Sequence, residues 1–257
     1  MFIPDVTGVF LPYDALQFHM HTGTDHAIDG TYFGADMHLV HQEVGGGRLS
    51  VLGFFIEPTS PSGLGKFSDL LTEWELVAAE TLSTCGGETP ATFGGRRYLD
   101  EAVAKKEEQK NRKLPRSFNP YGLVPDGSSM YFYDGSLTTP PCTEIVWWNV
   151  IDKPVSISVR EYLRLTNLIL DYVNPATCEA GTVAAPSGFT GRPVQMINDR
   201  KITHLCPSGF KDPFTESVMT QTELQQQKSK TDTSSASVAS AVIGVFSAFV
   251  ATAVMFM

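Results

Sequence analysis

The stretch Gln17-Phe18-His19-Met20-His21 alternates polar and apolar side chains, and Asp36-Met37-His38-Leu39-Val40-His41 repeats that alternation further along the chain. A period of two predicts two β-strands. Residues two apart on a strand point to the same face, so His19 and His21 project together while the apolar side chains between them face the opposite, buried side. One face of the predicted sheet therefore carries imidazoles.

Turn-forming residues fill the segment 22–30 between these stretches, and they can bring the chain back antiparallel. In that arrangement His38 lies opposite His19 and His21. Three imidazoles that converge from neighbouring strands make an open three-nitrogen site, and zinc with a fourth, exchangeable water is its commonest occupant. The histidines therefore predict a Zn2+ centre.

A second block, Gly135-Ser136-Leu137-Thr138-Thr139-Pro140-Pro141, lies far along the chain. Together with the histidine stretches, Glu144-Ile145-Val146-Trp147-Trp148 and Arg192-Pro193-Val194-Gln195, it resembles the α-class, eukaryotic-type carbonic anhydrases. The resemblance runs in order from about Val9 to about His204. An ordered set of blocks is far more specific than a single motif. It implies a mainly β (α+β) fold, built on a large central mixed, mostly antiparallel sheet with peripheral helices.

The resemblance also implies a zinc enzyme that hydrates carbon dioxide reversibly to bicarbonate and a proton, through hydroxide formed at the metal. The metal ligands that it implies are His19, His21 and His38. Gln17 matches the hydrogen-bond partner of the first histidine, and Asp36 matches that of the third. Such partners fix the ring orientation of metal ligands.

Thr138 matches the threonine whose hydroxyl orients the hydroxide and passes its own proton toward a carboxylate, while its backbone N–H contacts the developing anion. Asp25 matches that carboxylate, and Thr139 matches a bicarbonate contact. Asp25 and Asp36 stand where the family usually has glutamate, so the charge is kept but its reach is shorter, and we expect reduced or retuned activity. The apolar wall that the resemblance implies around carbon dioxide consists of Val40, Val51, Leu137, Val146 and Trp148.

Members of this family carry a substantial N-terminal part before the first histidine strand, and here that strand lies near residue 1. That part usually supplies the proton-shuttle histidine, and no histidine in this sequence matches it. If this sequence is the complete protein, we therefore expect slow turnover that depends on buffer concentration. No signal peptide is visible at Met1-Phe2-Ile3-Pro4-Asp5, so we expect a truncated sequence whose missing part carries one.

The composition suits a globular protein, with 42% hydrophobic and 18% charged residues among 257. Lys and Arg number 19 against 28 Asp and Glu, which gives a formal net charge of −9. No basic cluster interrupts this acidic balance, which argues against a nucleic-acid partner. The sequence does not indicate an oligomeric state.

Three segments follow one another along the chain: an expected carbonic-anhydrase-like domain over 1–210, with an insertion at about 83–115, a polar linker over 211–237, and a tail over 238–257. The tail has no charge and is just long enough to cross a bilayer as a helix. We expect it to be a GPI-attachment signal or a transmembrane anchor, which would hold the protein at the extracellular or lumenal face of a membrane.

Four cysteines are widely spaced without a C-x-x-C pair, which argues against a cysteine zinc site. Their even number, with a membrane-directed tail, favours two disulfides. Cys142 follows Pro-Pro where extracellular members of the family often have a disulfide cysteine, whose partner lies in the N-terminal part. We therefore expect Cys142 to be single, and Cys178 with Cys206 is the expected pair.

Periodicity and turn signals predict the remaining elements. Strands are expected at 6–10, 15–21, 34–41, 49–56, 130–133, 142–151 and 155–159, with a turn at 11–14, a glycine-rich hairpin at 44–48, and amphipathic helices at 67–82 and 160–172.

His26 and His41 are expected to make structural hydrogen bonds, and His204 to lie on the surface. Two other interpretations stay open. A cupin-type metalloenzyme shares the H-x-H pattern, but the later cupin block is missing. A membrane-displayed, carbonic-anhydrase-like binding module with weak or no activity is the second; such relatives typically lose a ligand histidine, whereas all three are present here.

Overall fold

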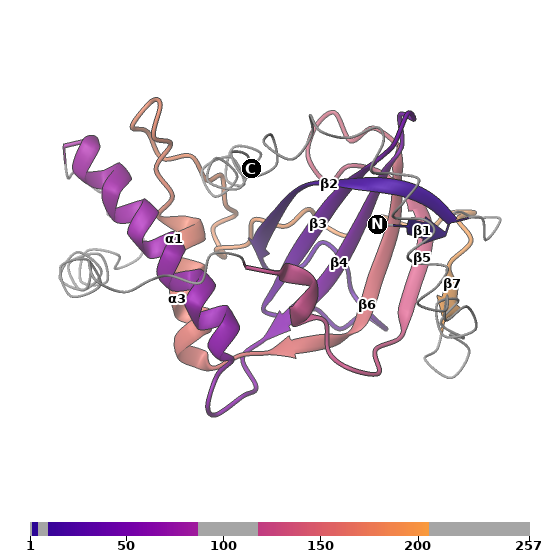
Figure 1. The fold of residues 1–257 in the computed structure, drawn as a ribbon, viewed down its shortest axis with the longest axis horizontal. Helices are drawn as coiled ribbons and strands as arrows, with labels where there is room; N and C mark the ends of the chain where they lie inside the picture. Colours follow the sequence, from indigo (N-terminus) through magenta and orange to yellow (C-terminus); the bar gives the residue numbers. More distant parts are fainter. Residues whose placement is uncertain (1, 5–9, 87–117, 206–257) are drawn as a thin grey trace, which may run out of the picture.

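One mixed sheet dominates the computed structural model, which describes residues 2–4, 10–86 and 118–205 (Figure 1). Within these residues the sheet has seven strands in the order β1-β2-β3-β4-β6-β5-β7. The elements are β1 (Phe2–Pro4), β2 (Phe10–Thr22), β3 (Ala35–Glu43), β4 (Leu49–Glu57), α1 (Gly65–Thr84), the 3-10 helix η1 (Pro120–Leu123), β5 (Met130–Gly135), β6 (Val146–Ser156), α3 (Val159–Leu170) and β7 (Thr203–Leu205).

All neighbouring strands are antiparallel except β4 and β6, which run parallel. A parallel pair needs a long crossover, and here α1, η1 and β5 lie between the two strands in the chain. The expected mixed, mostly antiparallel sheet with peripheral helices is confirmed.

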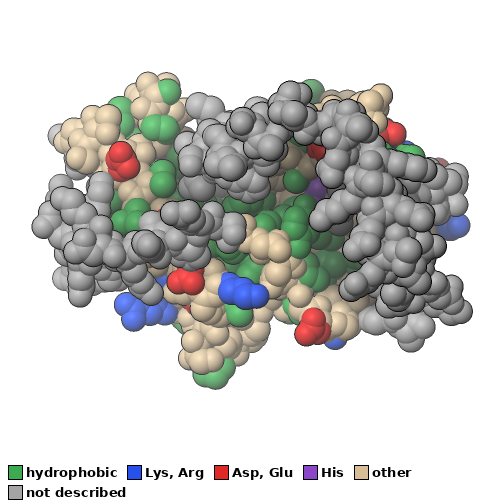
Figure 2. All heavy atoms as spheres, in the orientation of Figure 1, with side chains coloured by type: hydrophobic (Ala, Val, Ile, Leu, Met, Phe, Trp, Pro, Cys, Tyr) green, Lys and Arg blue, Asp and Glu red, His purple; other side chains and the backbone are tan. Residues whose placement is uncertain are grey.

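The two faces of the sheet have separate cores. One face packs against α1 and α3, which lie side by side at one end of the sheet (Figure 1), and it buries Met20, Met37 and Leu39 with helix residues such as Leu71 and Leu165. The opposite face buries a smaller cluster, which includes Val40, Val51, Val146 and Trp148. On the view in Figure 2, hydrophobic side chains fill the middle, and the charged side chains are scattered around them.

Polar contacts join the two helices. Ser158 and Glu161 form a capping box at the start of α3, and the Glu161 carboxylate also accepts the backbone N–H of Leu64 at the start of α1. Further along, the Arg164 guanidinium forms an ion pair with the buried Glu75. The helix predictions over 67–82 and 160–172 are confirmed to within a few residues at each end.

Three strand predictions were wrong in their boundaries, and one of them is the strand expected at 142–151, which begins only at Val146 and continues to Ser156. The expected turn at 11–14 lies inside β2, which continues through Pro12 and takes up the irregularity as a bulge at Leu16. Pro12 pairs with the short strand β1 and accepts the N–H of Val44 through its carbonyl, so its missing donor breaks little pairing. The strand expected at 155–159 also does not exist as such, because Val155 belongs to β6 and the helix begins at Val159.

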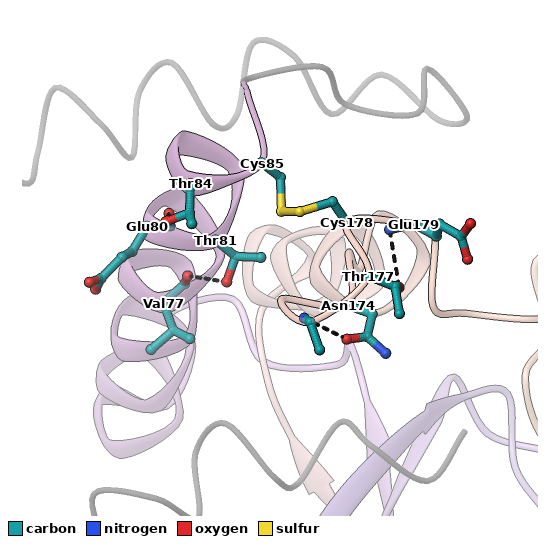
Figure 3. Close-up of a disulfide and its surroundings, with 10 residues drawn as sticks. Val77, Glu80, Thr81, Thr84, Cys85, Asn174, Thr177, Cys178 and Glu179 are labelled. Atoms are coloured by element: carbon teal, nitrogen blue, oxygen red, sulfur yellow. Dashed lines mark hydrogen bonds between the residues drawn. A yellow bond between two sulfur atoms is a disulfide. The ribbon is translucent and has the colours of Figure 1, made fainter.

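The disulfide prediction was also wrong. Cys178 pairs with Cys85, not with Cys206, because the end of α1 lies beside the turn that follows α3, with the two Cα atoms 5.4 Å apart (Figure 3). Cys142 is free, as expected, and Cys206 lies outside the described residues.

Much of the predicted insertion at 83–115, the linker at 211–237 and the tail at 238–257 lie outside the described residues, so these predictions stand as predictions. Among the helices that are described, none combines the length and the hydrophobicity that crossing a membrane requires.

Candidate metal centre

Strands β2 and β3 place three imidazoles at one point on the sheet. His19 pairs directly with His38 in the antiparallel register, and His21 pairs with Asp36. The three ring centroids lie 5.0 to 5.1 Å apart, and one nitrogen of each ring lies within 4.8 Å of the others. The structure therefore brings together the three histidines that the sequence singles out.

Polar neighbours orient two of these rings. The Oε1 atom of Gln17 lies 2.8 Å from Nδ1 of His19, and because an amide oxygen only accepts, Nδ1 carries the proton and Nε2 faces the cluster. The Asp36 carboxylate lies 3.3 Å from Nε2 of His38. The other nitrogen of His38, Nδ1, lies 3.3 Å from Nε2 of His19. Gln17 and Asp36 thus lie beside the histidines that the sequence assigned to them.

The third ring has no such neighbour. Both nitrogens of His21 are buried, and neither has a hydrogen-bond partner among the residues that the structure describes. Leaving a buried polar group unpaired costs about 1–3 kcal/mol. A metal ion would supply the missing partner, and three imidazole donors with an open position match zinc better than calcium or magnesium, which prefer oxygen ligands. The donor set and the unpaired nitrogens therefore fit Zn2+.

Burial and neighbouring charges set the protonation of the cluster. Burial, together with the adjacent His38 and His21, holds the pKa of His19 well below its usual value, so this ring is neutral. Burial alone would raise the pKa of Asp36, but the adjacent His38 outweighs that effect and holds it at about 2. Burial alone would lower the pKa of His38, which the Asp36 and Asp25 carboxylates raise instead. Asp36 is therefore an ionised carboxylate beside the His38 ring.

Asp25 lies next to the histidines, in the loop after β2. Its Oδ2 atom is 3.8 Å from Nε2 of His21 and 3.9 Å from Nδ1 of His38. Its backbone N–H donates to Asp36, and its Oδ1 atom accepts the backbone N–H of Arg192. Asp25 is thus buried against the cluster, with its backbone fixed by Asp36 and its carboxylate fixed by Arg192.

Thr138 and Asp25 line one cavity of about 180 Å³. No hydrogen bond joins the Thr138 hydroxyl to Asp25 in the described part of the chain, where Oδ1 of Asp25 is taken by Arg192 and Oδ2 is unpaired. Asp25 reaches one methylene less far than the glutamate usual in the family. Thr139 lies next in the same loop, where its carbonyl accepts the N–H of Cys142 at 2.9 Å.

The predicted apolar wall forms on the sheet beside the histidines. Four of its members are buried in one cluster, and the fifth, Leu137, packs against that cluster while partly exposed. The buried members are Val40, Val51, Val146 and Trp148.

A glycine of β4 lies beside the imidazole of His38. Gly53 of β4 lies opposite His38 in the register. A Cβ atom at this position would meet Cδ2 of His38 at 3.4 Å and the Trp148 ring at 3.5 Å. A Cβ atom at position 53 would thus lie in ordinary van der Waals contact with both rings, which border this position closely.

His26 makes the structural hydrogen bond expected of it. Its Nε2 atom lies 2.7 Å from the hydroxyl of Tyr133, and burial lowers its pKa to about 4, so the ring is neutral. His26 could also join Asp36 and His38 around a metal. That set keeps only one of the three cluster histidines, and the Asp36 carboxylate already accepts the N–H of Asp25.

Sequence reasoning missed the role of the segment 188–192. Thr190 closes against the end of β2 through two hydrogen bonds with Thr22, at 2.9 and 3.0 Å, and this places the backbone of Arg192 on Asp25. The only signal for it was the block Arg192-Pro193-Val194-Gln195 within the family resemblance. Because the donor is the backbone N–H of Arg192, the identity of the side chain at that position does not predict the contact.

Known proteins share this sequence pattern and fold. The family model for eukaryotic-type carbonic anhydrase matches residues 96–206. A Caenorhabditis elegans protein assigned as carbonic anhydrase 3 is 31% identical over 211 residues, which cover 79% of this chain and 69% of that protein. Human carbonic anhydrase 3 is 27% identical over 210 residues, which cover 74% of this chain and 65% of its own length.

The fold agrees with these matches. The structure of a halotolerant carbonic anhydrase from Dunaliella salina superposes with a TM-score of 0.50 at 20% identity, covering 76% of this chain and 61% of that one. A mainly β protein with three imidazoles converging from neighbouring strands has a donor set that could hold a metal ion. This chain belongs to the carbonic anhydrase family. It spans 69% of the length of the Caenorhabditis elegans protein, 65% of human carbonic anhydrase 3 and 53% of a carbonic anhydrase from Nostoc.

Proposed function

We propose that this chain hydrates carbon dioxide reversibly to bicarbonate and a proton at a zinc ion held by His19, His21 and His38. The observation that carries the proposal is the convergence of three imidazoles, of which His21 has both nitrogens buried and unpaired. When bound, zinc lowers the pKa of water from about 15.7 to about 7 and so supplies hydroxide at neutral pH.

The neighbours of the histidines hold the donor atoms in place. Gln17 fixes the proton of His19 on Nδ1, and the Asp36 carboxylate, 3.3 Å from Nε2 of His38, favours a proton on that nitrogen, which would leave Nε2 of His19 and Nδ1 of His38 for a metal. Neutral imidazoles leave the full positive charge of the ion at the site, which is what an acidifying metal requires.

Substrate would lie against the apolar wall. A nonpolar gas gains free energy when it leaves water for apolar surface, and Val40, Val51 and Trp148 provide such surface beside the histidines. Thr138 is proposed to orient the reacting oxygen, with Asp25 as the acceptor for its hydroxyl proton. That role requires Thr138 and Asp25 to approach each other across the cavity that both of them line.

The test combines metal analysis with stopped-flow carbon dioxide hydration. We expect about one zinc per chain, and turnover that a sulfonamide abolishes. The variant His38→Ala should lose the zinc and the turnover. The control His204→Ala changes a β7 ring that stacks on Tyr131 of β5, and it should keep both. Chain without zinc would overturn the proposal. Zinc without turnover would instead support the non-enzymatic binding module.

A further inference from the structure

None of the three cluster histidines, His19, His21 and His38, lines the cavity that Asp25 and Thr138 share. Its remaining wall includes Arg192, Arg200 and Tyr133. The Cζ atom of Arg200 lies 5.7 Å from the centre of the Tyr133 ring, and both arginines and this tyrosine line one space of about 180 Å³. None of the apolar residues predicted around carbon dioxide, apart from Trp148, contributes to this wall.

Among the described residues, the hydrogen bonds of both guanidinium groups go to neutral acceptors. Arg192 donates to the hydroxyl of Ser136 at 3.2 Å and to the carbonyl of Leu137 at 3.5 Å. Arg200 donates to the carbonyl of Ile197 at 2.9 Å and to that of Met196.

The arginine–carboxylate ion pairs in the described residues join Arg48 with Asp134 and Arg164 with Glu75. Neither arginine of the cavity therefore has a carboxylate partner there. Guanidinium groups form their strongest hydrogen bonds with carboxylates and other oxyanions, often in a two-pronged geometry.

The net charge of the wall sets the charge of a matching ligand. Asp25 is the acidic residue of this lining, and it stands against the two arginines, which leaves one positive charge in excess. Tyr133 stays neutral because burial raises its pKa. Its hydroxyl keeps a proton to donate to an anion when it accepts the hydrogen bond from His26.

We propose that this cavity binds a small monovalent oxyanion of the carboxylate type, held by Arg192, Arg200 and the hydroxyl of Tyr133. Resting on the proposed function, we assign bicarbonate as its occupant during catalysis, because the cavity shares Thr138 and Asp25 with the metal centre. Bicarbonate and a small carboxylate present the same pair of oxygens to a guanidinium, so the arms of the test must separate them.

The test is a calorimetric titration of the full chain with sodium bicarbonate and, separately, with sodium propionate, at fixed pH and ionic strength. Each titration is run on protein as purified and again after a chelator has removed metal. We expect saturable binding of both anions in both states. Binding that disappears with the metal belongs to the histidine cluster and overturns the proposal. Because metal-free protein carries the result, failure of carbon dioxide hydration leaves this test intact.

Matched variants locate the site. Arg200→Gln should weaken anion binding about tenfold or more, since it removes a charged hydrogen-bond donor. Arg160→Gln makes the same charge change at an exposed position at the start of α3 and should leave binding unchanged. Equal weakening by the two variants would overturn the proposal, because it would show a nonspecific charge effect.

A second variant keeps the proposal testable if Arg200→Gln does not fold. Val194 lines the cavity and is 45% exposed, so Val194→Glu should fold and should weaken binding by adding a negative charge. Unchanged affinity in a folded Val194→Glu protein would overturn the site. Binding of propionate without bicarbonate would uphold the carboxylate site and overturn the assignment of bicarbonate.

Discussion

The two faces of strands β2 and β3 are buried almost equally, yet one buries apolar side chains and the other buries imidazoles and carboxylates. Met37 is fully buried and the next residue, His38, is 1% exposed. Met37 packs among aliphatic and aromatic side chains that reach the helices, while His38 faces two other imidazoles and two carboxylates. One face thus gains stability from burial, whereas the other buries polar atoms at a cost that a ligand must offset. Four predictions test whether stability and chemistry separate so cleanly.

The largest effect is expected on the imidazole face. His21→Ala should abolish stoichiometric zinc binding and lower carbon dioxide hydration by more than about a hundredfold, because losing even a partner of a metal ligand costs 10–100-fold. Zinc content by mass spectrometry and stopped-flow rates check this. Far-UV circular dichroism should stay unchanged, since the variant removes two unpaired buried atoms. A variant that kept one zinc per chain would refute the ligand assignment.

The matching substitution on the helix face is Leu39→Ala. Leu39 is 3% exposed, and truncating a buried leucine costs about 2–5 kcal/mol of unfolding free energy. Urea unfolding measures the loss, and the folded fraction should retain its zinc. Leu163→Ala on α3 is the control, because that side chain is 56% exposed and its loss should fall within about 0.5 kcal/mol. Loss of zinc from folded Leu39→Ala protein would show that the two faces are coupled.

The disulfide should act on stability alone. Replacing both Cys85 and Cys178 by serine should lower the unfolding free energy by about 2–4 kcal/mol, since the bond closes a loop with a sequence separation of 93. Denaturant unfolding without reductant checks this, with Cys142→Ser as a control near zero. An equal effect of Cys142→Ser would contradict the observed pairing.

The smallest effect concerns pH. Nδ1 of His41 donates to the carbonyl of Ser50, so Nε2 accepts from the hydroxyl of Tyr121, and burial lowers the pKa of this neutral ring. The unfolded chain therefore takes up a proton at a higher pH than the folded one, and stability falls as pH drops below about 6.5, the ordinary histidine value. In metal-free protein, unfolding free energy should fall less steeply over this range in His41→Gln than in the wild type. Parallel curves would show that His41 does not titrate on unfolding.

How far the sequence predicts the structure depends on the range of the contacts. The histidine strands and both helices follow from alternation and helical spacing, which are local, and their neighbours Gln17 and Asp36 lie two residues from the rings they contact. The continuation of β2 through Pro12 was missed because a proline between turn-forming residues predicts a turn under any local rule. The Cys85–Cys178 bond and the contact of Arg192 with Asp25 join residues 93 and 167 positions apart, where periodicity carries no information.

A substitution at Gly53 would reach the candidate metal centre through the ring of His38, without replacing any of the three histidines. Alanine at this position would meet the ring of His38 at an ordinary van der Waals distance, whereas a branched side chain would push into it. Evolutionary drift or protein engineering on β4 could therefore rotate an imidazole, and so retune metal affinity, by changing the volume of a residue that has no chemistry of its own.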